Sequence, residues 1–216
     1  MKKLSEYQTM AFDCDGVILN SNHIKTQAFY SLALPYGTLV AADLVDYHVA
    51  NGGIARDKKI DHLFHSILKR APSKGERTNL MDTYANLIFE RLMKAEIAYG
   101  LKDLKLRTKG AEWIVVSGGN QGELRTIFER RGLDSHFPIA NVFGSPRSKH
   151  QIIEDGHKQG QFKAPVLFIG DSHYDHQVAQ DFNFDFAFTS AWSEWKNPKL
   201  GENSIMIDYI ADLLEI

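Results

Sequence analysis

Two aspartates separated by one residue are the first candidates for chemistry in this sequence. Asp13 and Asp15 directly follow the apolar run Thr9–Phe12 and precede Gly16, which permits a sharp turn. Side chains at positions i and i+2 of an extended chain point to the same side, so both carboxylates should face one pocket. Two anions this close repel each other unless a cation, a proton or strong hydrogen-bond donors compensate. A polar turn that merely ends a strand would use the same residues.

Two more polar groups follow apolar runs further along the chain. Ser117-Gly118-Gly119-Asn120 comes after a run ending at Val116 and leads into a helical pattern. A hydroxyl and backbone N–H groups at a helix N-terminus can cradle a phosphate, although a capping serine with a glycine turn reads the same way. Lys149 stands at the start of the next helical pattern. A cation is unfavourable there, which suggests an anionic partner rather than a solvated lysine.

A third group, Gly170-Asp171-Ser172-His173-Tyr174-Asp175, follows the apolar run Val166–Ile169. Its aspartates are four residues apart where a strand should become a helix. A helix cap with acids in the first turn is the plain alternative. All these groups nevertheless lie at the carboxyl ends of successive predicted strands, where a parallel sheet assembles its site. The sequence therefore predicts one shared site.

The apolar runs predict an α/β fold with a doubly wound parallel sheet. Most are continuous rather than alternating, as in strands covered on both faces. Helical patterns separate the later runs. The predicted strands are Thr9–Phe12, Trp113–Val116, Ile139–Phe143, Val166–Ile169 and Phe184–Phe188, and the predicted helices are Gln121–Arg131, Lys149–Lys158, His173–Asp181 and one near Ile207–Leu214.

About 100 residues separate the first two predicted strands, far more than one helical crossover needs. Apolar residues in this stretch recur at helical spacing. We expect an all-helical insertion over the strand ends, with residues 22–103 as a cap domain and residues 1–21 and 104–216 as the core. The predicted cap helices are Ile24–Leu34, Ala41–Ala50, Ile60–Leu68 and Lys74–Ala98.

Composition narrows the class of protein. The chain has 25 basic and 27 acidic residues, a net charge of −2, which argues against binding nucleic acid through bulk charge. It has no apolar run long enough to span a membrane and no signal-peptide pattern. The single cysteine, Cys14, fits a reducing compartment. We expect a cytoplasmic protein, a monomer or homodimer, whose partner is a small molecule rather than nucleic acid or a membrane.

The motifs DxDGV, Ser117, Lys149 and GDSxxD, in this order, resemble those of the haloacid dehalogenase superfamily. The insertion looks like its C1-type cap on a Rossmann-like core. Gly53-Ile54-Ala55-Arg56 resembles the cap loop of the phosphoglycolate phosphatase and β-phosphoglucomutase group. The chain departs from that group at Asn20, where Asp is common, at Ala55, where Ser is more usual, and in the sequence around Lys149. These departures leave the substrate open.

The resemblance implies a Mg²⁺-dependent phosphatase of a small phosphorylated metabolite, acting through an aspartyl-phosphate. Asp13 would be the nucleophile and Asp15 the general acid and base. Asp13, the Asp15 carbonyl and Asp171 would bind Mg²⁺, with Asp175 supporting a metal-bound water or Lys149. The transferring oxygens would be bound by Ser117, Gly118, Gly119 and Lys149, and the rest of the substrate by Arg56 and Lys25.

Other functions use related residues. A phosphomutase would keep every core residue, whereas a phospho-receiver module would not need the insertion. Dehalogenases of this superfamily lack the second aspartate. Three further groups are expected to be structural: His173 and His176 solvated, Cys14 in the core, and Trp192-Ser193-Glu194-Trp195 packed on the sheet edge.

Overall fold

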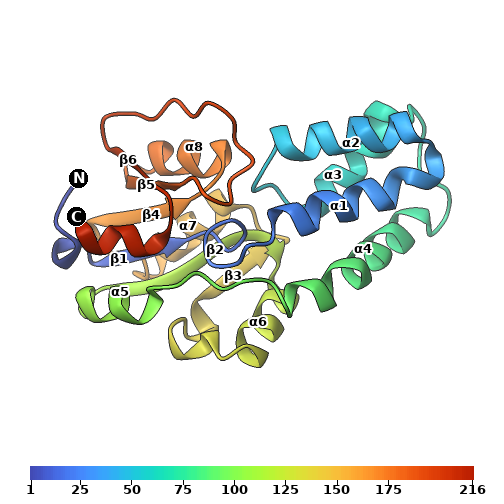
Figure 1. The fold of residues 1–216 in the computed structure, drawn as a ribbon. Helices are drawn as coiled ribbons and strands as arrows, with labels where there is room; N and C mark the ends of the chain where they lie inside the picture. Colours follow the sequence, from blue (N-terminus) through green and yellow to red (C-terminus); the bar gives the residue numbers. More distant parts are fainter.

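The computed structural model describes residues 1–216 and contains one six-stranded parallel sheet (Figure 1). The strand order is β3-β2-β1-β4-β5-β6, so the chain winds from β1 to one side and then to the other. Ligands of such sheets bind where the winding reverses, at the carboxyl ends of the strands. The strands are β1 Thr9–Phe12, β2 Glu112–Asn120, β3 Val142–Ser145, β4 Val166–Gly170, β5 Asp185–Thr189 and β6 Ser204–Ile207.

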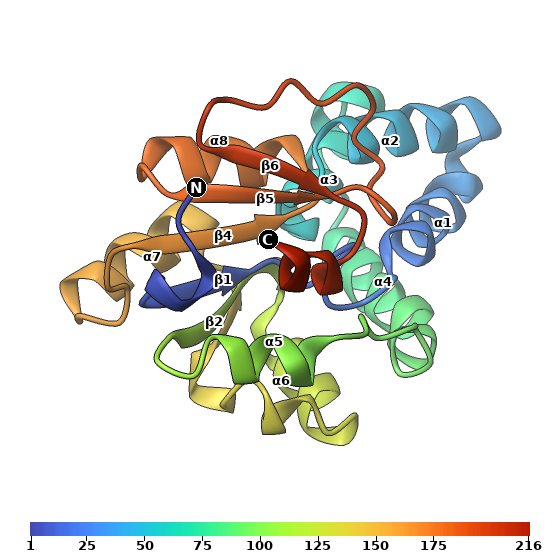
Figure 2. The same ribbon diagram turned by 60° about the vertical axis from the view of Figure 1, so that its left-hand side comes forward.

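Helices cover both faces of the sheet (Figure 2). Successive strand residues alternate between two apolar clusters: Phe12 and Trp113 belong to one, Ala11 and Ile114 to the other. This alternation explains why the strands read as continuous apolar runs. Helices α5 (Leu101–Arg107) and α6 (Gln121–Arg130) pack in the first cluster, and α7 (Lys149–Lys158) and α8 (His173–Asp181) in the second.

Four of the five α-helices between β1 and β2 project beyond the sheet, the fifth being α5 (Figure 1). They are α1 Asn22–Ala33, α2 Thr38–Ala50, α3 Arg56–His62, which continues as a π-helical turn to Ile67, and α4 Glu76–Leu92. Helix α1 packs against both α2 and α4. The predicted all-helical insertion after the first strand is confirmed, and its domain limits, 22 and 103, stay a prediction.

Two predicted elements were wrong in detail. Residues Ile139–Asn141 form a 3₁₀ turn, because the Asn141 side chain donates a hydrogen bond to the Trp113 carbonyl that a longer strand would use (3.1 Å). The C-terminal helix is a 3₁₀ turn, Ile210–Glu215, preceded by the unpredicted edge strand β6. An edge strand with mostly exposed or half-buried side chains leaves little apolar pattern to detect.

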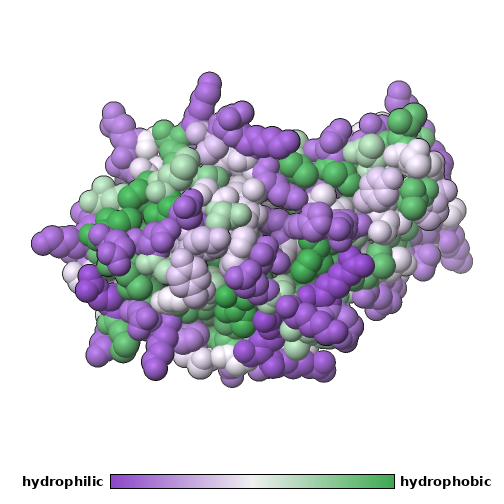
Figure 3. All heavy atoms as spheres, in the orientation of Figure 1, coloured by the Kyte–Doolittle hydropathy of each residue, from purple (hydrophilic) through white to green (hydrophobic).

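The outer surface offers no extended apolar face on the side shown in Figure 3, where hydrophilic side chains separate the apolar patches. Eight large apolar side chains are exposed, Leu39 on α2 being the most exposed at 80%. None of the helices has the length and apolar character needed to cross a membrane.

An aromatic cluster around Phe137, on one face of the sheet, should contribute strongly to the free energy of unfolding. The ring of Phe137 lies 5.2 Å from Phe12, 5.1 Å from Trp113 and 5.6 Å from Phe128, centroid to centroid. We expect Phe137→Ala to lower the free energy of unfolding by about 3–5 kcal/mol, because it leaves a cavity in a packed core. Urea denaturation measures this. The exposed-site control Leu39→Ala should stay within about 0.5 kcal/mol of wild type, and similar losses for both variants would contradict this account.

Candidate active site

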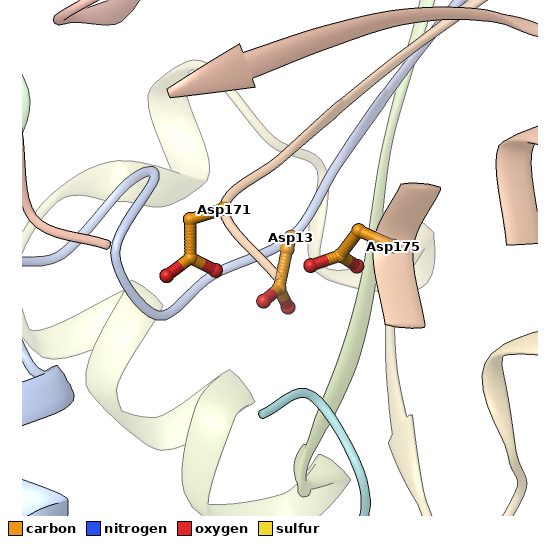
Figure 4. Close-up of side chains that lie close together, drawn as sticks. All are labelled: Asp13, Asp171 and Asp175. Carbon is orange, nitrogen blue, oxygen red and sulfur yellow. The ribbon is translucent and has the colours of Figure 1, made fainter. Parts of the chain in front are cut away.

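Three carboxylates from separate segments meet at the carboxyl end of the sheet (Figure 4). Asp13 follows β1, Asp171 follows the neighbouring strand β4, and Asp175 lies in the first turn of α8. All three are buried, and one oxygen of each lies within 4.8 Å of the others. Parallel pairing of β1 with β4 thus places acids that are more than 150 residues apart side by side.

Lys149 is the cation that faces this cluster. Its Nζ lies 3.1 Å from Asp13 Oδ1 and forms an ion pair with Asp175, and its side chain is fully buried. Burial alone would lower the pKa of Lys149, but the charges of Asp13 and Asp175 outweigh it and raise the pKa. These anions explain why a lysine stands at the N-terminus of α7.

One lysine does not neutralise three acids. Burial raises the pKa of Asp13 to about 7; Lys149 opposes this rise, and Asp175 and Asp15 add to it. Burial and the charges of Asp13 and Asp175 hold the pKa of Asp171 well above its ordinary value. Asp13 Oδ1 is buried, and apart from its ion pair with Lys149 it has no hydrogen-bond partner. Excess negative charge and clustered carboxylate oxygens are the features that a bound Mg²⁺ would satisfy.

The other oxygens of the cluster have fixed partners. Asp175 Oδ2 accepts hydrogen bonds from the Ser172 amide (3.1 Å) and hydroxyl (2.5 Å), while Ser172 caps α8. Asp175 is therefore both a helix-capping acid and a member of the cluster. Asp171 Oδ2 accepts a hydrogen bond from Asn22 Nδ2 (2.6 Å). With both its oxygens engaged, Asp175 is less free than Asp13 to bind a metal.

Asp15 lies outside the three-carboxylate cluster but lines the same cavity. Its carboxylate accepts a hydrogen bond from Ser21 Oγ (2.5 Å) and forms an ion pair with Lys25. Burial would raise the pKa of Asp15, but the charge and hydrogen bond of Lys25 and the hydrogen bond of Ser21 hold it below its ordinary value. Lys25, which we expected to bind substrate, is thus engaged by Asp15.

The Ser117-Gly118-Gly119 segment belongs to β2, which continues to Asn120. Ser117 is fully buried and its Oγ accepts a hydrogen bond from the Gly119 amide (3.1 Å). Asn120, rather than Ser117, caps α6 by accepting from the Glu123 amide (3.1 Å). Gly118 and Gly119 line the cavity. The segment therefore reaches the cavity at the end of a strand instead of a turn, and its expected role as a phosphate cradle stays a prediction.

A cavity of about 620 Å³ lies between the sheet and the four inserted helices. Asp13, Asp15 and Asp171 line it from one side, and Lys25, Arg56 and Lys59 from the other. Arg56 forms an ion pair with Glu123 of α6 at 2.5 Å, so the insertion and the core are joined across the cavity.

The glycine loop of the insertion touches the core directly. A Cβ atom on Gly118 would lie only 2.2 Å from the Gly53 carbonyl oxygen, and one on Gly53 would lie 2.9 Å from Ser172 Oγ. Gly53 also has φ of +81°, which side chains other than glycine rarely adopt. Glycine at both positions is therefore what allows this close approach.

The segment Trp192–Trp195 packs beside the sheet edge, as expected, with Trp195 against Phe188 of β5 and Trp192 against Tyr209 after β6, and it also reaches the site. Asn22 Nδ2 donates to the Trp192 carbonyl (2.8 Å), Ser193 Oγ donates to the Asp171 carbonyl (2.5 Å), and Thr26 Oγ1 donates to Glu194 (2.8 Å). The expectation of edge packing missed these contacts, because a loop's destination leaves no periodic signal. The segment connects α1 to the carboxylate cluster.

The remaining candidate residues differ in how far they are buried. His173 is exposed, but His176 is buried against Phe186 and Trp195, so the expectation that both are solvated was wrong for His176. Neither belongs to the carboxylate cluster. Cys14 is buried in the apolar core, as its position between the two aspartates indicates.

Several site residues gave no usable signal in the sequence. They are polar residues on helices that the fold alone brings to the cavity: Ser21, Asn22, His48, Lys59 and Glu123. Buried polar residues within a helical pattern could have been noticed, but their partners lie far away in the chain.

The sequence matches the model of the haloacid dehalogenase-like hydrolase family over residues 7–183. The chain belongs to this family. Among solved structures, it is similar to a predicted phosphatase from Clostridium acetobutylicum (20% identity, 97% of each chain covered, TM-score 0.71). It is also similar to a predicted phosphoglycolate phosphatase from Haemophilus somnus (17% identity, 97% of each chain covered, TM-score 0.70). A third similar structure is β-phosphoglucomutase from Clostridium difficile (17% identity, 96% of this chain and 93% of that chain covered, TM-score 0.69). No curated protein matched the sequence.

Repulsion among the crowded acids should lower the free energy of unfolding when no metal is bound. The pKa of Asp13 is about 7 when folded and about 4 when unfolded, so the folded state binds more protons between these values. The contribution of Asp13 to the free energy of unfolding therefore falls as pH rises from about 4 to 7. In EDTA, we expect Asp13→Asn to melt about 3–8 °C above wild type at pH 7.5, with the gap closing toward pH 4.

Thermal melts from pH 4 to 8 measure this difference. Asp43→Asn, at an exposed position on α2, is the matched control and should show no such gap. A lower melting temperature for Asp13→Asn throughout the range would mean that Asp13 stabilises the fold.

Proposed function

We propose that the protein is a phosphatase that hydrolyses a small phosphorylated metabolite through an aspartyl-phosphate on Asp13. One observation carries the proposal: Asp13 is a buried carboxylate beside Lys149, with two further carboxylates within 4.8 Å, at the wall of a large cavity. A phosphate monoester brings negative charge that this site can accept only with added positive charge. The cavity has room for the rest of a small metabolite.

The reaction takes two steps at Asp13. Its free oxygen attacks phosphorus, and the bond from phosphorus to the ester oxygen breaks while Asp15 gives that oxygen a proton. In the second step Asp15 takes a proton from water, which attacks phosphorus and releases inorganic phosphate and the Asp13 carboxylate. Lys25 lowers the pKa of Asp15 and so favours the ionised form that the second step requires. The negative charge of an arriving phosphate raises the pKa of Asp15 and so favours the protonated form that the first step requires.

The site residues fit Mg²⁺, with Asp13, Asp171 and the Asp15 backbone carbonyl as its ligands and Asp175 in support. Bound there, Mg²⁺ would offset the charge of the phosphate against that of the acids. Lys149 stabilises charge on the transferring oxygens from the other side. The hydroxyl of Ser117 and the N–H of Gly118 offer hydrogen bonds to the same oxygens.

The inserted helices act as the cap of this site. Their limits, residues 22–103, enclose the loop that contacts Gly118 and Ser172. Closing them over the substrate would exclude water and strengthen each charge interaction inside. A phosphomutase would use the same core residues, since it differs only in returning the phosphate to its product.

Release of inorganic phosphate from a panel of phosphorylated metabolites, with Mg²⁺ present, tests the proposal. A phosphatase releases phosphate from at least one monoester at a steady rate. A mutase converts the ester without net release, and a phospho-receiver stops after one equivalent. No release from any ester would overturn the proposal.

Asp13→Asn should abolish this release, because the amide has similar shape but is not nucleophilic. Residual turnover above about 1% of wild type would count against a covalent intermediate. EDTA should silence the wild type and added Mg²⁺ should restore it. Full activity after exhaustive chelation would exclude the metal from the mechanism.

Arg56 has a partner in this structure, so we propose that it acts through Glu123 to hold the cap against α6. Arg56→Ala and Glu123→Gln should each lower kcat/KM about three- to tenfold, as expected for an ion pair worth about 1 kcal/mol. The double variant should lose no more than either single one. If Arg56→Ala alone is impaired, Arg56 contacts the substrate directly, as the family resemblance implies.

A further inference from the structure

The cap carries one buried cation that has no acidic partner. Lys59, on α3, is 3% exposed and lines the cavity, yet no carboxylate lies within 4 Å of its Nζ. The other two buried cap cations on this cavity are neutralised: Lys25 by Asp15 and Arg56 by Glu123. A buried, unpaired charge is costly unless something compensates it.

The surroundings of Lys59 do not supply that compensation. Its Nζ lies 2.6 Å from His48 Nδ1 and 5.5 Å from the ring centre of Phe29. Burial and the charge of Lys25 lower the pKa of Lys59 to about 7, against the weaker pull of distant acids. Glu194, also at the cavity, accepts hydrogen bonds from Thr26 and makes no ion pair with Lys59.

His48 is unsatisfied as well. It is 6% exposed, lines the cavity, and its Nε2 is buried with no hydrogen-bond partner. When the Lys59 ammonium donates to Nδ1, the proton of the neutral imidazole resides on Nε2, which is then a donor without an acceptor. The His48 N–H therefore lacks an acceptor, which is rare for a buried polar group, and the Lys59 ammonium beside it has an imidazole nitrogen but no anion as its partner.

From this geometry we infer that Lys59 and His48 form a subsite for a second acidic group of the substrate. Together they offer a positive charge and a neighbouring N–H donor, which a carboxylate or a second phosphate would accept. The subsite rests on the proposed phosphatase function for its first anion, the phosphate at Asp13. The substrate would then carry acidic groups at both ends, one at the core and one at the cap.

The test compares 3-phosphoglycerate with glycerol 3-phosphate, which differ in a carboxylate against a neutral hydroxymethyl group. Glycerol 1,3-bisphosphate keeps the C2 hydroxyl and carries a phosphorylated hydroxymethyl group in place of the carboxylate. Wild type should favour one of the doubly acidic esters over glycerol 3-phosphate in kcat/KM by at least about tenfold. Which of them is favoured identifies the second group.

Lys59→Met should reduce that preference at least about tenfold, and Lys59→Gln should do the same if the Met variant does not fold. Lys58→Met is the matched control, since Lys58 is the adjacent exposed lysine of α3, and it should keep the preference. Lys59→Met should also melt about 2–4 °C above wild type, because it removes an unpaired buried charge. A preference unchanged in both Lys59 variants overturns the subsite.

Binding separates this inference from the proposed function. In the Asp13→Asn protein, which cannot turn over, calorimetric titration with the same three ligands should show the same preference, and adding Lys59→Met should remove it. Preferential binding without turnover by wild type would support the subsite and overturn the phosphatase. Turnover by wild type with no preference between the ligands would support the phosphatase and overturn the subsite.

Discussion

Electrostatic repulsion among buried carboxylates is the constraint on which the rest of this structure depends. Asp13, Asp171 and Asp175 lie within 4.8 Å of one another, and only Lys149 is placed to offset them. The raised pKa of Asp13 and Asp171 expresses the imbalance that remains. A site built in this way favours ligands that bring positive charge, and through them an anionic substrate.

The sheet and its helices hold these repelling acids in place, because each acid follows a buried strand or begins a capped helix. Asp13 and Asp171 end adjacent parallel strands whose side chains alternate between two apolar clusters. Lys149 and Asp175 begin helices that are anchored by capping boxes at Ser148 and Ser172. Ordinary capping residues thus set the position of charged groups that the chemistry uses.

The inserted helices give the site its second wall. They meet the core through a glycine loop packed on Gly118, through the Arg56–Glu123 ion pair and through α1, whose Asn22 binds Asp171. The segment carrying Trp192 and Glu194 completes this junction from the other end of the chain. Under the proposed function, recognition of the substrate beyond its phosphate falls to cap groups such as Lys59, which has no acidic partner.

The sequence alone determined the class of fold, because apolar strands, helical periodicity and the motifs at Asp13, Ser117, Lys149 and Asp171 are local patterns. Helices α7 and α8 have the predicted bounds, since capping is a local interaction as well. The edge strand β6 escaped prediction and the bounds of β3 were wrong, because both depend on distant partners. Only the tertiary structure decided which charges meet: Lys25 with Asp15, Arg56 with Glu123, and Lys59 with no acid at all. The physical reason is that an ion pair depends on distance in space, which the spacing of residues along a folded chain does not specify.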